Sequence, residues 1–79
     1  MSNNKNLTKV TIGTNIVEIN SNAFFNCKNL KTVTIKSVYL TRKTANKKAF
    51  KNAHKKLVIR VPKKVKKIYK KIFKGLKVK

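Results

Sequence analysis

Three short segments of the chain alternate apolar and polar side chains, which is the pattern of a strand buried on one side only. The segments are Leu7-Thr8-Lys9-Val10-Thr11-Ile12, Leu30-Lys31-Thr32-Val33-Thr34-Ile35 and Leu57-Val58-Ile59-Arg60-Val61. We therefore predict strands over about 7–12, 31–36 and 57–61. Pro62 ends the third strand, because proline has no N–H to donate to a neighbouring strand.

A second pattern recurs between these segments. Ala23-Phe24-Phe25-Asn26-Cys27 returns 26 residues later as Ala49-Phe50-Lys51-Asn52-Ala53, and Asn20-Ser21-Asn22 offers side chains that cap a short helical turn. Val10 and Val33 are 23 residues apart and Val33 and Ile59 are 26 apart. We place the three extra residues in the basic stretch 41–48, as a loop on the outer surface. A unit of this length that recurs in order indicates a solenoid.

The residues after Pro62 follow a helical period instead. Their apolar members form one stripe with spacings of 3, 1, 3, 1 and 3: Val65, Ile68, Tyr69, Ile72, Phe73 and Leu76. This predicts an amphipathic helix over 63–74, stopped near Gly75. The last unit of a repeat array needs a cap, so we expect residues 63–76 to cover it. A basic helix on a membrane surface is the competing interpretation, and it needs the same stripe.

The repeat has the form Leu7-x-x-Val10-x-Ile12, then Ile16-x-x-Ile19-x-x-x-Ala23-Phe24-x-x-Cys27-x-x-Leu30. It resembles the BspA-type leucine-rich repeat, and residues 57–71 resemble the lysine-rich C-terminal ending of such proteins in Gram-positive gut bacteria. The resemblance covers residues 7–76. It implies a curved α/β solenoid with a parallel sheet on one face. It also implies a secreted or surface-attached protein that acts in adhesion and protein binding.

We predict one leucine-rich-repeat domain over residues 7–76, preceded by a disordered tail over residues 1–6. The N-terminus has no apolar leader, so we expect a cytoplasmic protein if the chain is complete. If it is a piece of a longer protein, the family resemblance predicts a secreted or cell-surface location. No segment approaches the roughly 20 apolar residues of a membrane span. The open flank near Leu7 predicts self-association or further repeats upstream.

The inventory of reactive side chains is small. The chain has Glu18 as its one acid, His54 as its one histidine and Cys27 as its one cysteine. Paired-carboxylate catalysis and a metal site both need more groups than this. Cys27 occupies an inward repeat position, where a small buried side chain is expected. We therefore predict no catalysis, no metal and no cofactor.

Charge suggests which partners the chain attracts. The formal net charge is +21, and eighteen of the 22 Lys and Arg residues lie in residues 36–79. Such a chain attracts polyanions, acidic proteins and anionic surfaces.

Two sets of binding residues follow from these patterns. The concave face of the sheet is predicted to bind a protein or cell-surface ligand through Lys9, Thr11, Lys31, Thr32, Thr34, Lys36 and Arg60. The alternative is a nucleic acid or anionic polysaccharide bound by the basic half. Its predicted contacts are Arg42, Lys43, Lys47, Lys48, Lys51, Lys55, Lys56, Lys66, Lys67, Lys70 and Lys71.

Overall fold

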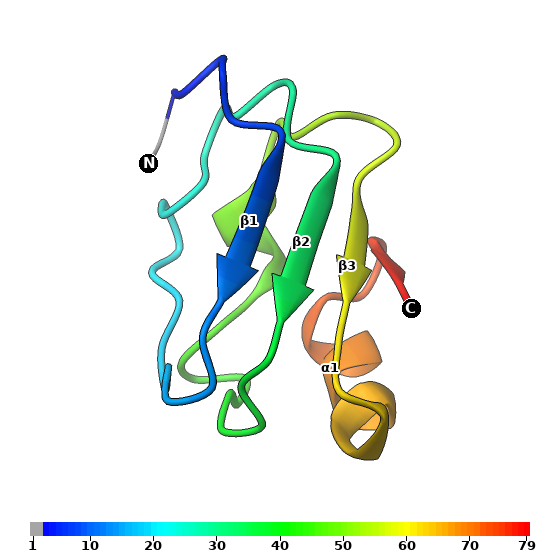
Figure 1. The fold of residues 1–79 in the computed structure, drawn as a ribbon. Coiled ribbons are helices and arrows are strands. Elements are labelled where there is room, and N and C mark those ends of the chain that lie inside the picture. The colour runs from blue at the N-terminus through cyan, green and yellow to red at the C-terminus, as the bar shows by residue number, and fades with distance from the viewer. Residues whose placement is uncertain (1–2) are drawn as a thin grey trace.

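The computed structural model describes residues 3–79 and contains one sheet of four parallel strands in the order β1-β2-β3-β4 (Figure 1). The strands are β1 (Lys9–Ile12), β2 (Thr32–Ile35), β3 (Val58–Arg60) and β4 (Lys77–Val78). The first three confirm the predicted strands, and each is two residues shorter than predicted. The fourth was not predicted, because two residues are too few to show an alternating pattern.

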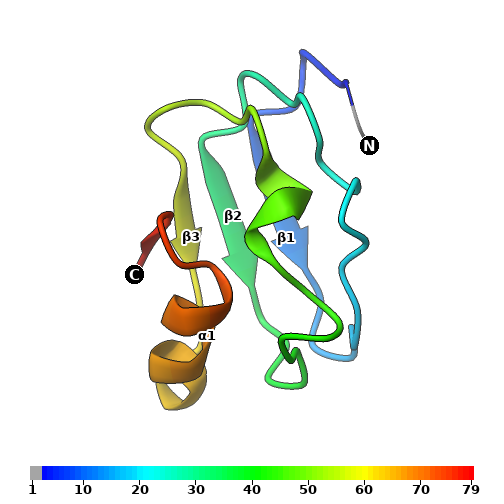
Figure 2. The same cartoon turned by 180° about the vertical axis from the view of Figure 1, so that it is seen from behind.

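Strand register confirms the spacing of the repeat. Val10 pairs with Val33, Val33 with Ile59, and Ile59 with Val78. These residues form one inward row, in which Val33 and Ile59 have no exposed surface. Parallel neighbours need a crossover between them, and the segments that contain Ala-Phe supply it behind the sheet (Figure 2).

The two Ala-Phe segments differ slightly in form. The first is a series of hydrogen-bonded turns instead of a helix, in which Cys27 N–H donates to Phe24 C=O at 3.2 Å. The second forms the 3₁₀ turn η1 (Lys47–Phe50). Each segment begins at an asparagine whose side chain accepts a backbone N–H two residues later, Asn20 in the first and Asn46 in the second. These caps confirm the predicted role of the first asparagine.

Backbone hydrogen bonds between the two segments locate the extra residues of the second unit. Ile19 N–H donates to Thr44 C=O at 2.7 Å, and Phe24 N–H donates to Ala49 C=O at 3.0 Å. These bonds place Ile19 and Phe24 beside the residues 26 positions later in the chain. Ile12, in contrast, pairs with Ile35, which is 23 positions later. The insertion lies within residues 36–44, so its prediction within 41–48 was only partly right. A turn over 41–44 closes it.

A column of aromatic rings passes through the core. The rings of Phe24 and Phe50 stack at a centroid distance of 5.5 Å, and Phe50 contacts Phe73 at 5.8 Å. Tyr69 meets Phe73 edge to face at 6.3 Å. All four are buried. Cys27 is also buried, as its inward repeat position predicted, and Tyr69 and Phe73 cover the last unit as the apolar stripe predicted.

The C-terminal helix is shorter than predicted. A 3₁₀ turn, η2 (Lys63–Val65), leads into α1 (Lys66–Ile72), where the sequence predicted a helix over 63–74. Ile68 is 55% exposed, so its predicted place in the core was wrong. A helix turns about 100° per residue, so Ile68 lies about 100° around the helix axis from the fully buried Tyr69. This position is at the edge of the apolar stripe. Gly75, with φ 93°, then turns the chain back toward the sheet.

A small polar network joins this helix to both repeat units. The Tyr69 hydroxyl donates to Ser37 C=O at 2.8 Å and accepts Leu40 N–H at 3.2 Å. The fully buried Ser37 hydroxyl in turn donates to Ile16 C=O and accepts Tyr39 N–H at 3.1 Å. The apolar stripe of the helix therefore packs against the repeat units. This contradicts the membrane-surface interpretation, which needs the same stripe.

Asparagines in the left-handed region recur once per unit. Asn3, Asn26 and Asn52 have φ of 61°, 58° and 63°. The Asn52 side-chain amide donates to the Asn26 side-chain oxygen at 2.6 Å. Asn3 N–H donates to Phe25 C=O at 2.6 Å, so residue 3 already lies against the first segment. The predicted boundary between a tail and the domain at residue 7 stays a prediction.

We expect Asn26→Ala to lower the free energy of unfolding by about 2 kcal/mol. Alanine in the left-handed region costs about 1 kcal/mol, and the lost hydrogen bond costs about 1 kcal/mol more. Asn26→Gly is the matched control, because glycine adopts this φ without strain and loses only the hydrogen bond. Urea unfolding of the three proteins measures the difference. Equal losses in both variants would contradict a role for the positive φ.

Candidate functional site

The front of the sheet, which no helix covers in Figure 1, is an open face. Strand register gives it two rows of side chains. Strand pairing places Lys9, Thr32, Val58 and Lys77 in one row and Thr11, Thr34 and Arg60 in the other. Lys9, Thr11 and Arg60 are exposed, and both threonines of β2 are half-buried. Because the crossover segments and α1 lie behind the sheet (Figure 2), these rows are accessible from the front.

One end of this open face is hollowed. A depression of about 500 Å³ at the carboxyl ends of β2 and β3 contains three of the predicted residues, Thr34, Lys36 and Arg60. Lys36 N–H donates to Ile12 C=O at 2.8 Å, which holds it beside β1 just beyond the end of its own strand. Lys9, Thr11 and Thr32 share the face but do not line the depression. Lys31 lies at the start of β2, where its N–H donates to Thr8 C=O at 3.0 Å.

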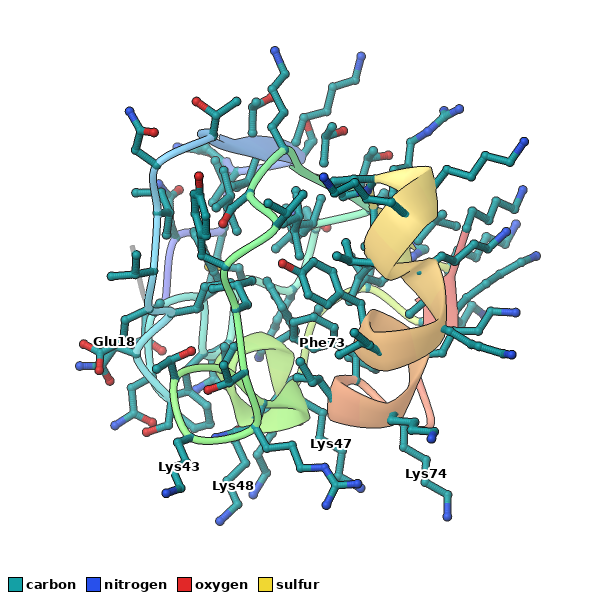
Figure 3. All side chains as sticks on the ribbon, turned by 90° about the horizontal axis from the view of Figure 1, so that it is seen from below. Glu18, Lys43, Lys47, Lys48, Phe73 and Lys74 are labelled. Carbon is teal, nitrogen blue, oxygen red and sulfur yellow. The ribbon has the colours of Figure 1, made fainter. Side chains whose placement is uncertain are left out.

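The predicted polyanion residues do not form one continuous surface. Arg42 and Lys43 lie in the turn of the insertion, and four others lie on α1, away from the core: Lys66, Lys67, Lys70 and Lys71. Figure 3 shows lysine side chains pointing outward in several directions, with Lys43, Lys47 and Lys48 on the rear side. Five members do come together in one groove: Lys47, Lys48, Lys51, Lys55 and Lys56.

This groove, of about 930 Å³, lies between residues 47–57 and the C-terminal segment 75–77. A sixth lysine, Lys77, lines it and was missed by the sequence reasoning. Nothing in the sequence signals that Lys77 lies near residues 47–57, because β4 alone brings it there. Apolar side chains also line the groove, and we call the two half-buried ones, Ala53 and Leu76, its apolar floor.

His54 also lines the groove and is held by its neighbours. Its Nδ1 accepts the Lys56 backbone N–H at 3.0 Å, and its own backbone N–H donates to Leu30 C=O at 3.2 Å. Desolvation lowers the pKa of His54 below its ordinary value, and the charges of Lys31, Lys55 and Lys56 lower it further. The ring is therefore predominantly neutral at neutral pH, and the positive charge of the groove comes from lysine.

Within residues 3–79, no three His, Cys, Asp or Glu side chains gather where they could hold a metal ion. No helix in that range is both long enough and apolar enough to cross a membrane.

Comparison with known families agrees with this geometry. The family model described as "BspA type Leucine rich repeat region (6 copies)" matches residues 1–79. Searches of curated proteins and of solved structures give no significant match. The family match covers the whole chain, including both Ala-Phe segments and all four strands. This chain belongs to the BspA-type leucine-rich repeat family.

Proposed function

We propose that the chain is a short leucine-rich-repeat solenoid that acts as a non-catalytic binding module for a protein or cell-surface ligand. The observation that carries this proposal is the open face of the sheet, with its two side-chain rows held in register. Membership of the family supports a repeat-based binding or adhesion module, and with it a surface or secreted location.

The chemistry of the open face suits a polar, partly acidic partner. Thr11, Thr32 and Thr34 each offer a hydroxyl that both donates and accepts hydrogen bonds. Arg60 and Lys36 add positive charge beside the depression, where Arg60 can bind a carboxylate in a bidentate manner. The backbone of the strands is paired within the sheet, so a partner would meet a surface that needs little reordering.

A double variant of the open face, Thr11→Glu with Arg60→Glu, tests this proposal. The immobilised wild-type chain should retain a protein from a nuclease-treated cell-surface extract in about 0.5 M salt, where exposed charges are screened. We expect the immobilised double variant not to retain that protein. The matched control is Lys67→Glu with Lys70→Gln on α1, which changes the net charge by the same amount and should retain that protein. Equal retention by both variants would contradict the proposal, as would recovery only without nuclease.

The second candidate function is binding of a polyanion by the basic half, which the concentration of cations in residues 36–79 favours. Contacts to six to ten phosphates would weaken binding about 10³–10⁵-fold between about 50 and 200 mM salt. A salt titration with an oligonucleotide therefore separates the two candidates. Binding through the open face should change much less over that range.

A further inference from the structure

The lysine groove lies beside the outer edge of the second repeat unit, which is the edge that faces away from the first unit. Between the first and second units, Phe24 and Asn26 donate their N–H groups to Ala49 and Lys51 C=O at 3.0 and 2.9 Å. In the part of the chain that the structure describes, no backbone hydrogen bond joins residues 46–53 to residues 75–77. The chain forms α1 and β4 instead of a third Ala-Phe segment. A ligand from outside the chain can therefore lie against this edge.

The charge around this edge is of one sign. Six lysines line the groove, and Glu18, the one acid of the sequence, borders two other depressions. A concave surface with charges of one sign concentrates oppositely charged ligands. The groove therefore favours a ligand that carries several negative charges.

The remaining lining distinguishes between classes of acidic ligand. Single-stranded nucleic acids gain affinity by stacking bases on exposed aromatic rings. The phenyl ring of Phe50 is only 2% exposed because Phe24 and Phe73 cover it, and the other ring of the groove, the His54 imidazole, is half-buried and accepts the Lys56 N–H. The apolar floor of Ala53 and Leu76 instead suits an aliphatic side chain. The phosphate groups of a nucleic acid gain nothing from this floor.

We propose that the groove binds an acidic peptide segment in an extended conformation. Its carboxylates contact the lysines, and an aliphatic side chain between them lies on the apolar floor. This site goes beyond the open-face function, with which it shares only Lys77 at the boundary between the two surfaces.

Fluorescence anisotropy with labelled probes tests the proposal. The first probe is a short peptide that alternates aspartate or glutamate with leucine, and the second has serine in place of each leucine. The third is an oligouridylate of the same net charge. We expect the leucine peptide to bind about tenfold more tightly than the serine peptide, because burial of one aliphatic side chain is worth at least that factor. The oligouridylate should bind no better than the serine peptide.

Variants of the protein locate the bound peptide. Lys51→Glu with Lys55→Glu should weaken binding of the leucine peptide about tenfold, since each exchange removes an attraction and adds a repulsion. Lys67→Glu with Lys70→Glu has the same net charge and should change affinity by no more than about twofold. The open-face variant should still bind the peptide, so this result does not depend on the open-face function. If the glutamate pair fails to fold, Lys51→Gln with Lys55→Gln replaces it, with a matched glutamine control.

His54 provides a local reporter, because it is the only histidine in the chain. Carboxylates brought near its ring favour the protonated form, so the peptide should raise the His54 pKa measured by NMR. Lys31, Lys55 and Lys56 oppose that protonation in the free protein. Affinity should therefore increase as the pH falls through the His54 pKa, and decrease again near about pH 4, where the peptide carboxylates protonate.

Three results would overturn the proposal. Equal affinity for the leucine peptide, the serine peptide and the oligouridylate would mean that only charge is recognised. Equal losses in the groove variant and the α1 variant would mean that no single site binds the peptide. Saturating peptide that leaves the His54 resonances unchanged would place the binding site elsewhere.

Discussion

Replacing Phe50 with alanine is expected to remove about half of the free energy of unfolding of this protein. Phe50 is 2% exposed and lies between Phe24 and Phe73 in the aromatic column. Truncation of a buried phenylalanine to alanine typically costs about 3–5 kcal/mol through lost burial and the cavity left behind. A chain of this length has roughly 4–12 kcal/mol in total, and its net charge of +21 acts against compactness.

Denaturant unfolding followed by far-UV circular dichroism measures this loss. Phe25→Ala is the matched control, because Phe25 is the chain neighbour of Phe24 but is only half-buried. We expect the control to lose less than half as much. A loss below about 1 kcal/mol in Phe50→Ala would contradict the packing described for the column.

Tyr69→Phe is expected to cost about 2–4 kcal/mol although it removes a single oxygen atom. The ring would still pack against Phe73, so the change isolates the hydroxyl. Without the hydroxyl, Leu40 N–H and Ser37 C=O lose the partner that they have in the buried network. Each unsatisfied buried group costs about 1–3 kcal/mol, which exceeds the net gain from a typical hydrogen bond.

Tyr39→Phe serves as the control for this prediction. Tyr39 is 57% exposed, so loss of its hydroxyl should change stability by no more than about 0.5 kcal/mol. Thermal or urea unfolding of both variants gives the comparison. Similar stabilities for Tyr69→Phe and Tyr39→Phe would show that water satisfies the two backbone groups, and the proposed role of the network would be wrong.

Both predictions concern the link between α1 and the repeat units, and that link affects the candidate sites. Phe73 and Tyr69 hold the end of α1 against the second unit, and the chain then reaches Gly75 and β4. The far side of the groove is formed by residues 75–77. Loss of either anchor should therefore disturb the groove more than the open face, most of which lies on β1, β2 and β3.

Much of the open face could be predicted from the sequence. Alternation with a period of two assigns successive side chains of a strand to opposite faces. Once Val10, Val33 and Ile59 are placed inward, Thr11, Thr34 and Arg60 must face outward together. The same regular spacing placed Phe24 and Phe50 in the core, because equivalent positions of stacked units lie next to each other.

The local pattern by itself determined the strands, their register and the aromatic core, since each depends on neighbours in the sequence or on the repeat period. Only the tertiary structure decided the exposure of Ile68, the position of the insertion, the partners of the Tyr69 hydroxyl and the existence of β4. The groove was also decided by the tertiary structure, because it brings together Lys55 and Lys77, which a helix and a turn separate along the chain. Contacts between segments far apart in sequence depend on how the chain returns, and no local period encodes that path.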